Sequence, residues 1–191
     1  IGWGDAQFAN LGANMSHRGR DIDAAIPAVK ALLAGETVTD AYFGLVDATV
    51  GLRSSGPIEW WIGGTAEVAI DRAARLGDCW YGSPGQDDES IRVGVDRYRS
   101  AGGTRFALRR DALLLNDADQ ARESAQSLVT RGYRGLAFER LLTGSSNDVA
   151  ERATELAALG VDDIIVRCAS PDQPTAIETL QVLGQTIEQA A

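Results

Sequence analysis

The chain has 191 residues, 45% of them hydrophobic and 24% charged, and a net charge of −9. This length and composition predict one folded domain over residues 1–191 with a substantial core. The negative charge and the lack of a basic stripe argue against duplex nucleic acid or anionic membranes as partners. No apolar run approaches the roughly 18 residues of a membrane span and no signal peptide opens the chain, so we expect a cytoplasmic protein.

Protein-bound metal and disulfide chemistry are also disfavoured. The two cysteines, Cys79 and Cys168, both fall in predicted strands, and we interpret them as reduced core residues. The chain has a single histidine, His17, and neither a Cys-x-x-Cys nor a His-Glu-x-x-His motif. No metal site is therefore expected.

The amino-terminal part is predicted to hold one long helix between irregular segments. Ile1–Gly4 is typical of the end of a strand that enters a glycine-rich loop. Apolar residues at helical spacing predict a helix over 21–34 that contains Pro27 and ends at Gly35. We expect residues 36–57 to form a long loop over one face of the fold. Loops of this length are usually functional.

The centre of the chain has the pattern of a βαβ unit. Ile58–Gly64 reads as a strand that ends in a pair of glycines. Small residues at helical spacing then predict a helix from Ala66 to Gly77, with Thr65 as its N-cap. Asp78–Tyr81 follows as a second buried strand, in which Trp80 and Tyr81 are interpreted as core residues. Two strands joined by a helix are expected to be parallel.

The glycine pair would lie at the carboxyl end of its strand and at the amino end of its helix. Folds of the α/β class place ligands there, and free backbone N–H groups attract phosphate. We therefore predict a phosphate cradle made of Gly63, Gly64 and Thr65. The alternative is a tight turn that needs glycine only for its backbone conformation.

The rest of the chain continues to alternate helices and strands. Helices are predicted over 90–100, from Asp117 or Asp119 to Thr130, over 149–160 and over 175–189, and strands over 105–115 and 162–167. A loop that ends in a helix cap is predicted over 142–148. Continuous apolar strands that alternate with helices are typical of a parallel α/β barrel or a doubly wound sheet.

Several polar residues have more than one interpretation. Arg109 and Arg110 lie in mid-strand, and either could pair with Asp111 or contact a phosphate. Glu59 and Asp78 lie at the starts of their strands, away from the expected ligand end, and Asp78 is interpreted as a structural hydrogen-bond partner. His17 lies in a polar loop and is a weak candidate for a general base. No catalytic residue is assigned.

Some stretches together resemble a known family. They are Gly2-Trp3-Gly4 with Arg18-Gly19-Arg20, Leu32–Gly35, Trp60–Gly64 followed by Arg72–Trp80, and Gly160–Arg167. In this order they resemble the luciferase-like monooxygenases, over essentially the whole chain. The resemblance implies a (β/α)8 TIM barrel that binds coenzyme F420 or flavin mononucleotide (FMN). It also implies hydride transfer or oxygen insertion on a small organic substrate at the carboxyl ends of the strands.

The resemblance also implies further cofactor contacts. Trp3 and Gly4 would end a strand at the face where a flavin ring stacks, although they could equally belong to the core. Arg167 ends the last strand at the same face and could contact the ligand. These three residues join Gly63–Thr65 as candidate cofactor-binding residues.

The chain is short for a whole barrel, which needs roughly 250 residues. The resemblance implies that it covers the second half, from the end of strand four to strand eight, without strands one to three. A fragment, a sequence that lacks its start, or a half-barrel that dimerises would each explain this. We expect a homodimer or higher oligomer. Departures at Gln7, Ala24 and Cys79 leave open an alternative, a non-catalytic paralogue or half-barrel that acts as a flavin-binding or assembly partner.

Overall fold

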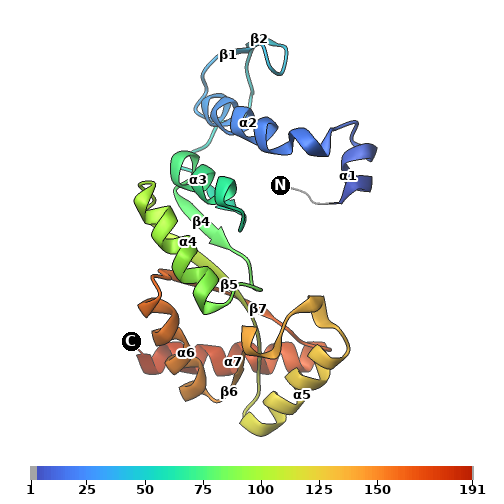
Figure 1. Ribbon diagram of the computed structural model, residues 1–191, viewed down its shortest axis with the longest axis vertical. Helices are drawn as coiled ribbons and strands as arrows, with labels where there is room; N and C mark the ends of the chain where they lie inside the picture. The colour runs from blue at the N-terminus through green and yellow to red at the C-terminus, as the bar shows by residue number, and fades with distance from the viewer. Residues whose placement is uncertain (1–3, 191) are drawn as a thin grey trace.

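The computed structural model describes the backbone of residues 4–190 and the side chains of residues 4–188. Trp3, one of the candidate cofactor contacts, lies outside the described residues. Figure 1 shows α1 and α2 at one end of the molecule and α5, α6 and α7 at the other, with parallel strands between them. Within the described residues, no helix is long and apolar enough to cross a membrane.

The amino-terminal part is more helical than predicted. Its helices are α1 (Asp5–Asn10), the 3-10 helix η1 (Met15–His17) and α2 (Arg18–Leu33). The predicted long helix is confirmed as α2, which begins three residues earlier than expected and contains Pro27. It ends at Leu33 with Ala34 as its C-cap, and the next residue, Gly35, has a φ of +87°. A glycine is needed there because other residues rarely adopt a positive φ.

A short hairpin lies within the segment that was predicted to be a loop. β1 (Val38–Asp40) and β2 (Leu45–Ala48) pair in antiparallel orientation. The Asp40 carboxylate closes the turn by accepting a hydrogen bond from the Phe43 N–H at 3.0 Å. The loop prediction for residues 36–57 was therefore wrong over the hairpin, whose strands are too short to show a clear alternating pattern.

Over residues 4–190, the main sheet contains five strands, and every pairing in it is parallel. They are β3 (Trp61–Gly63), β4 (Cys79–Gly82), β5 (Phe106–Leu114), β6 (Leu141–Gly144) and β7 (Asp163–Cys168). The expected parallel α/β architecture is confirmed. Two details differ, because β3 is shorter than the predicted strand from Ile58, and β6 occupies part of the segment predicted as a loop over 142–148.

Strand β5 organises this sheet, because three other strands pair with it. Its residues Ala107 and Leu108 pair with both β4 and β7, so these two strands lie along opposite edges of β5. Asp111 and Ala112 pair with both β6 and β7, so β6 shares the β4 edge further along. The spatial order is therefore β3-β4-β5-β7, with β6 beyond the end of β4.

The predicted helices of the second part are confirmed within a few residues. They are α3 (Glu67–Leu76), α4 (Asp88–Ser100), α5 (Ala118–Thr130), α6 (Ser146–Ala158) and α7 (Gln173–Ala190). Asp117, rather than Asp119, caps α5. Under α3 and α4, the buried rings of Trp80 and Phe106 stack with centroids 4.1 Å apart, which confirms Trp80 as a core residue.

Candidate functional site

An open groove of 920 Å³ lies where β3 and β4 end and where α2 and α3 begin. Its lining residues are Ser16, Arg18, Gly19, Gly63, Gly64, Thr65, Ala66, Val68, Ala69, Arg72, Tyr81, Gly82, Ser83 and Pro84. The groove thus contains the three residues of the predicted phosphate cradle. It also contains basic and hydroxyl side chains from α2 and from the β4–α4 loop, which sequence reasoning did not assign to it.

The backbone conformation at position 64 requires glycine. Its φ is +146°, and a Cβ at this position would lie 2.5 Å from the Cβ of Ala69. The carbonyl of Gly64 accepts a hydrogen bond from the Trp80 indole N–H at 2.8 Å. Because a trans peptide directs its N–H opposite to its carbonyl, the Thr65 N–H points away from Trp80 and the core. The described part of the chain offers this N–H no hydrogen-bond acceptor.

The amino end of α3 has no side-chain cap. Its N-cap residue is Ala66, so the prediction of Thr65 as the cap was wrong. In contrast, side chains of Asp87, Asp117 and Ser145 cap α4, α5 and α6. The first N–H groups of α3 therefore lack the usual acceptor. The exposed Thr65 hydroxyl on the groove is not used by the helix.

The acidic residue in the first turn of α3 does not act as the acceptor for these N–H groups. Glu67 places a negative charge in this turn. Its carboxylate accepts a hydrogen bond from Arg97 of α4 at 2.8 Å. Glu67 is not part of the groove lining. The positive end of α3 consequently faces a groove without carboxylates.

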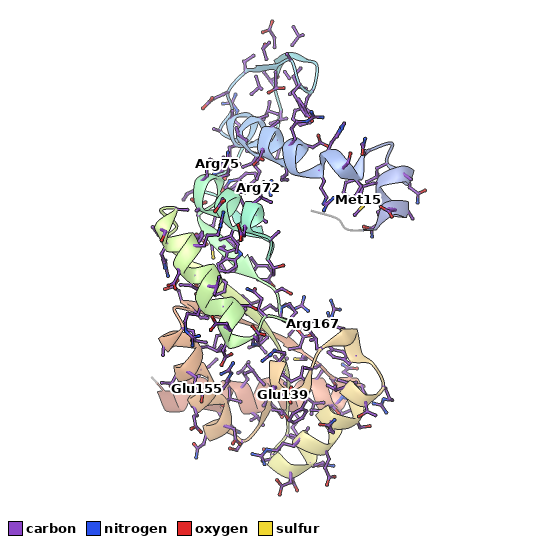
Figure 2. The ribbon with its side chains drawn as sticks, viewed as in Figure 1. Met15, Arg72, Arg75, Glu139, Glu155 and Arg167 are labelled. Carbon is purple, nitrogen blue, oxygen red and sulfur yellow. The ribbon has the colours of Figure 1, made fainter. Side chains whose placement is uncertain are left out.

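Arg72 fixes the position of α3 against α2. It is only 6% exposed, and its guanidinium binds both carboxylate oxygens of Asp23, at 2.8 and 3.2 Å. A third hydrogen bond reaches the carbonyl of Gly19 at 3.2 Å. The hydrogen bond from Arg72, together with Arg75, holds the pKa of the Asp23 carboxyl below its usual value. Figure 2 shows both arginines on α3, below α2.

Arg18 supplies a positive charge that no carboxylate neutralises. It is exposed at the start of α2, and its side chain donates a hydrogen bond to the carbonyl of Met15 at 2.9 Å. Among the residues described, none with a carboxylate lies within ion-pair distance of it. Since Arg72 is balanced by Asp23, Arg18 is the groove's unbalanced cation. An anion is the ligand that this charge favours.

A buried arginine holds the wall of the groove formed by the β4–α4 loop. Arg110 of β5 is 1% exposed and donates to the carbonyls of Pro84 at 2.9 Å and Gln86 at 3.0 Å. The Gln86 side chain in turn accepts the Ser83 N–H at 2.8 Å. Burial lowers the pKa of Arg110 to about 10. Arg110 thus positions Ser83 and Pro84, a role that the sequence did not suggest.

The neighbouring arginine takes one of the two roles considered for it. Arg109 forms an ion pair with the fully buried Asp111 at 3.0 Å, and the Tyr133 hydroxyl donates to the same carboxylate at 2.9 Å. Neither Arg109 nor Arg110 lines the groove. The alternation of a strand explains their difference, because Arg109 and Asp111 share one face and Arg110 lies on the other.

Two other candidate cofactor residues lie outside the groove. Gly4 is the extended N-cap residue of α1, and Arg167 is exposed on β7, where it is paired in register with Asp111. Figure 2 shows Arg167 well separated from Arg72. The structure therefore does not bring Gly4 or Arg167 together with Gly63–Thr65.

The residues considered for catalysis are either held in structural hydrogen bonds or exposed on the surface. Glu59 accepts hydrogen bonds from Arg105 and from the Trp61 indole, and Asp78 accepts the Trp60 N–H, as expected for a structural partner. His17 is exposed. Across the described residues, no group of His, Cys, Asp and Glu could hold a metal ion. Both cysteines are free, with Cys79 buried and Cys168 half-buried.

The fold of this chain is similar to those of several solved structures. The monooxygenase RslO1 from Streptomyces bottropensis superposes with a TM-score of 0.79 at 18% identity, covering 100% of this chain and 67% of that one. An F420-dependent secondary alcohol dehydrogenase in complex with an F420–acetone adduct gives 0.68 at 14% identity, covering 90% and 63%. EDTA monooxygenase (EmoA) from Chelativorans sp. BNC1 gives 0.70 at 15%, covering 99% and 64%.

The chain spans about two thirds of the length of these proteins. A search of curated protein sequences gave no significant match. A family model described as luciferase-like monooxygenase matches residues 1–185, which confirms the resemblance seen in the sequence. The chain belongs to the luciferase-like monooxygenase family.

Proposed function

We propose that this chain is part of a flavin- or deazaflavin-dependent oxidoreductase, and that the phosphate of FMN or coenzyme F420 binds in the groove beside Gly63, Gly64 and Thr65. The observation that carries the proposal is the uncapped amino end of α3, which opens onto a groove with an unbalanced Arg18 and no carboxylate. Backbone N–H groups at a helix amino end and a nearby guanidinium are the partners that a phosphate requires.

The groove fits the rest of such a cofactor as well. Its 920 Å³ lies within the usual range for small-molecule sites. Val68 and Ala69 of α3 and Tyr81 of β4 supply apolar and aromatic surface beside the proposed phosphate position. A bound flavin or deazaflavin would supply hydride-transfer or oxygen chemistry.

The residues of the chain would bind and orient the cofactor. The Thr65 N–H and hydroxyl would donate to the phosphate, and Gly64 would let the backbone approach it. Arg18 would contribute a charge-assisted hydrogen bond from the opposite wall. Arg72 lines the groove, but its charge is balanced by Asp23. Arg110 does not line the groove and would act indirectly, by holding the loop that forms its wall.

Both cofactor classes occur among, or fit, the solved structures with this fold. Two solved structures with this fold are F420-dependent, a secondary alcohol dehydrogenase and the tetrahydromethanopterin reductase from Methanopyrus kandleri. Others are monooxygenases. These likenesses support hydride transfer or oxygen insertion on a small organic substrate as the reaction class, and a direct titration with each cofactor would decide.

We further propose that β3, β4, β5 and β7 are consecutive strands of a TIM barrel of the bacterial luciferase type, and that the chain works as a homodimer or higher oligomer. In the described part of the chain, β3 pairs only with β4 and β7 only with β5. Each outer strand therefore has an edge of unpaired backbone groups, which proteins normally cover. Trp61 lies on the face of β3 opposite the core and is 36% exposed. This apolar side chain is a second surface that an oligomer or the rest of a barrel would cover.

A pair of neighbouring arginines gives the test of the cofactor site. Arg18 and Arg20 are both exposed at the start of α2, but only Arg18 lines the groove, whereas Arg20 donates to the Tyr42 hydroxyl. Titration with FMN and with F420, followed by cofactor fluorescence, should show at least roughly tenfold weaker binding for Arg18→Gln. Arg20→Gln should bind like the unaltered protein. Absence of binding to the unaltered protein would favour the alternative, an assembly partner without catalysis.

A further inference from the structure

A second cavity, of 370 Å³, lies at the opposite end of β3 from the groove. It is formed by the last turns of α2, the segment that precedes β3, and Trp60, which comes directly before the strand. Its lining residues are Lys30, Leu33, Ala34, Arg53, Ser54, Ser55, Gly56, Pro57, Ile58 and Trp60. None of these residues lines the groove, so the two cavities are separate.

The only lysine of the chain lies in this cavity. Lys30 is half-buried, and its ammonium donates to the carbonyl of Leu76, at the end of α3, at 2.8 Å. The same ammonium is 5.5 Å from the centre of the Trp60 ring. An ammonium has three N–H donors, so two stay available after the bond to Leu76. Lys30 makes no ion pair with any described residue.

A second cation lies across the carboxyl end of α2. Arg53 packs directly on Gly35, where a Cβ would lie 2.9 Å from the arginine Nε. Within residues 4–188, its guanidinium has neither an ion pair nor a hydrogen bond. In contrast, Arg97 and Arg105 each bind two carboxylates.

The acidic side chain closest in sequence to this cavity points elsewhere. Glu59 lies between Ile58 and Trp60, but its carboxylate binds Arg105 at 3.0 Å and the Trp61 indole at 2.9 Å. No lining residue is acidic. The two cations therefore create a positive potential in the cavity, and no described residue forms an ion pair with either of them.

The remaining walls are apolar or carry hydroxyl groups. Leu33, Ile58 and the half-buried Trp60 offer a flat apolar surface. Ser54 is bonded within its own turn, to Gly56, whereas Ser55 has no hydrogen bond in the described structure. The cavity thus places cations and a free hydroxyl next to an aromatic ring.

We propose that this cavity is a binding site for a small aromatic carboxylate, separate from the cofactor groove. The carboxylate would lie between Lys30 and Arg53, where charge-assisted hydrogen bonds are strongest, and the ring of the ligand would pack on Trp60. A volume of 370 Å³ accommodates a ligand with one ring. The inference does not depend on the identity of the cofactor.

Benzoate is the probe for this site, with benzyl alcohol as the uncharged control and acetate as the control without a ring. In calorimetric titrations of the full chain, benzoate should bind saturably, and each control should bind at least roughly tenfold more weakly. Arg53→Gln is the main variant, because Arg53 is exposed and its side chain makes no hydrogen bond to a described residue whose loss would unfold the protein. It should weaken benzoate binding at least roughly tenfold.

Two further variants separate this site from the groove. Arg18→Gln and Arg20→Gln should both keep full benzoate affinity, because neither residue lines the cavity. Absence of saturable benzoate binding, or equal affinity in Arg53→Gln, would overturn the proposal and leave Lys30 and Arg53 as caps of the carboxyl ends of α3 and α2. Loss of binding in Arg18→Gln alone would also overturn it by placing benzoate in the groove.

Discussion

The indole N–H of Trp80 donates a hydrogen bond to the carbonyl of Gly64 at 2.8 Å, so a fully buried core residue holds the backbone at the edge of the groove. Trp80 also stacks on Phe106 and contacts Gly94 of α4, where a Cβ would lie 2.5 Å from the indole. The geometry of the candidate cofactor site is therefore coupled to the packing of the core.

Replacing Trp80 tests this coupling. Trp80→Phe removes the hydrogen bond to Gly64 and leaves a cavity, which should lower the free energy of unfolding by about 2–4 kcal/mol. Urea unfolding measured by circular dichroism gives this value. Trp61→Phe, at a partly exposed tryptophan on the other face, should cost less than about 1 kcal/mol. Equal losses in the two variants would contradict the role assigned to Trp80.

The two glycines of the corner should differ in their tolerance of a side chain. Gly64→Ala introduces a methyl group against Ala69 at a φ that alanine rarely adopts, and should destabilise the fold by about 2 kcal/mol or more. At Gly63, a Cβ would only make ordinary contacts with Tyr81, at 3.5 Å or more. Gly63→Ala should therefore melt within a few degrees of the unaltered protein. A thermal melt of each variant decides, and similar melting temperatures would contradict the account.

Arg110 should affect cofactor binding without touching the cofactor. Arg110→Met leaves the carbonyls of Pro84 and Gln86 without their donor and should let the β4–α4 loop move. Cofactor affinity should fall roughly tenfold or more as the wall of the groove shifts. Arg92→Met, at an exposed arginine of α4, is the matched control. Unchanged affinity in a folded Arg110→Met protein would show that the loop keeps its position without Arg110.

The protein should lose stability in acid. Arginine hydrogen bonds hold the pKa values of Asp23, Asp88 and Asp163 below their ordinary value of 3.8. From about pH 5 upwards these carboxyls are charged in both the folded and the unfolded state, and the full stabilisation is present. As the pH falls through the lower folded-state pKa values, the unfolded chain binds more protons and the stabilisation disappears. Melting temperatures should thus be nearly constant from pH 7 to about 5 and then fall; a rise below pH 4 would contradict these ion pairs.

Local patterns in the sequence predicted the central βαβ unit well. The apolar run before Gly63 and the small residues of α3 each specify their element without help from distant residues. The β1–β2 hairpin and β6 were missed because polar residues such as Asp40, Asp47 and Thr143 interrupt their short apolar runs. Thr65 was assigned as a cap because its residue type suits that position, whereas the backbone starts the helix one residue later.

Only part of the candidate site could be predicted from the sequence. Gly63–Thr65 could be found because a strand and a helix meet there. Arg18 reaches the same groove because α2 packs on α3, through contacts such as the ion pair of Arg72 with Asp23, which are 49 positions apart. Arg110 could not be assigned because its partners, Pro84 and Gln86, are carbonyl groups, and any residue can supply a carbonyl. Tertiary contacts of this kind leave no local pattern.

The central claim is that the groove recognises a phosphate, and FMN and riboflavin differ by that group alone. Fluorescence titrations of the unaltered protein should show FMN binding at least roughly tenfold more tightly than riboflavin, because a phosphate adds charge-assisted hydrogen bonds. If F420 is the cofactor, the same difference should separate it from its deazaflavin without a phosphate. Arg18→Gln should reduce the difference. Equal affinity with and without the phosphate would contradict the assignment of Gly63, Gly64 and Thr65 as its cradle.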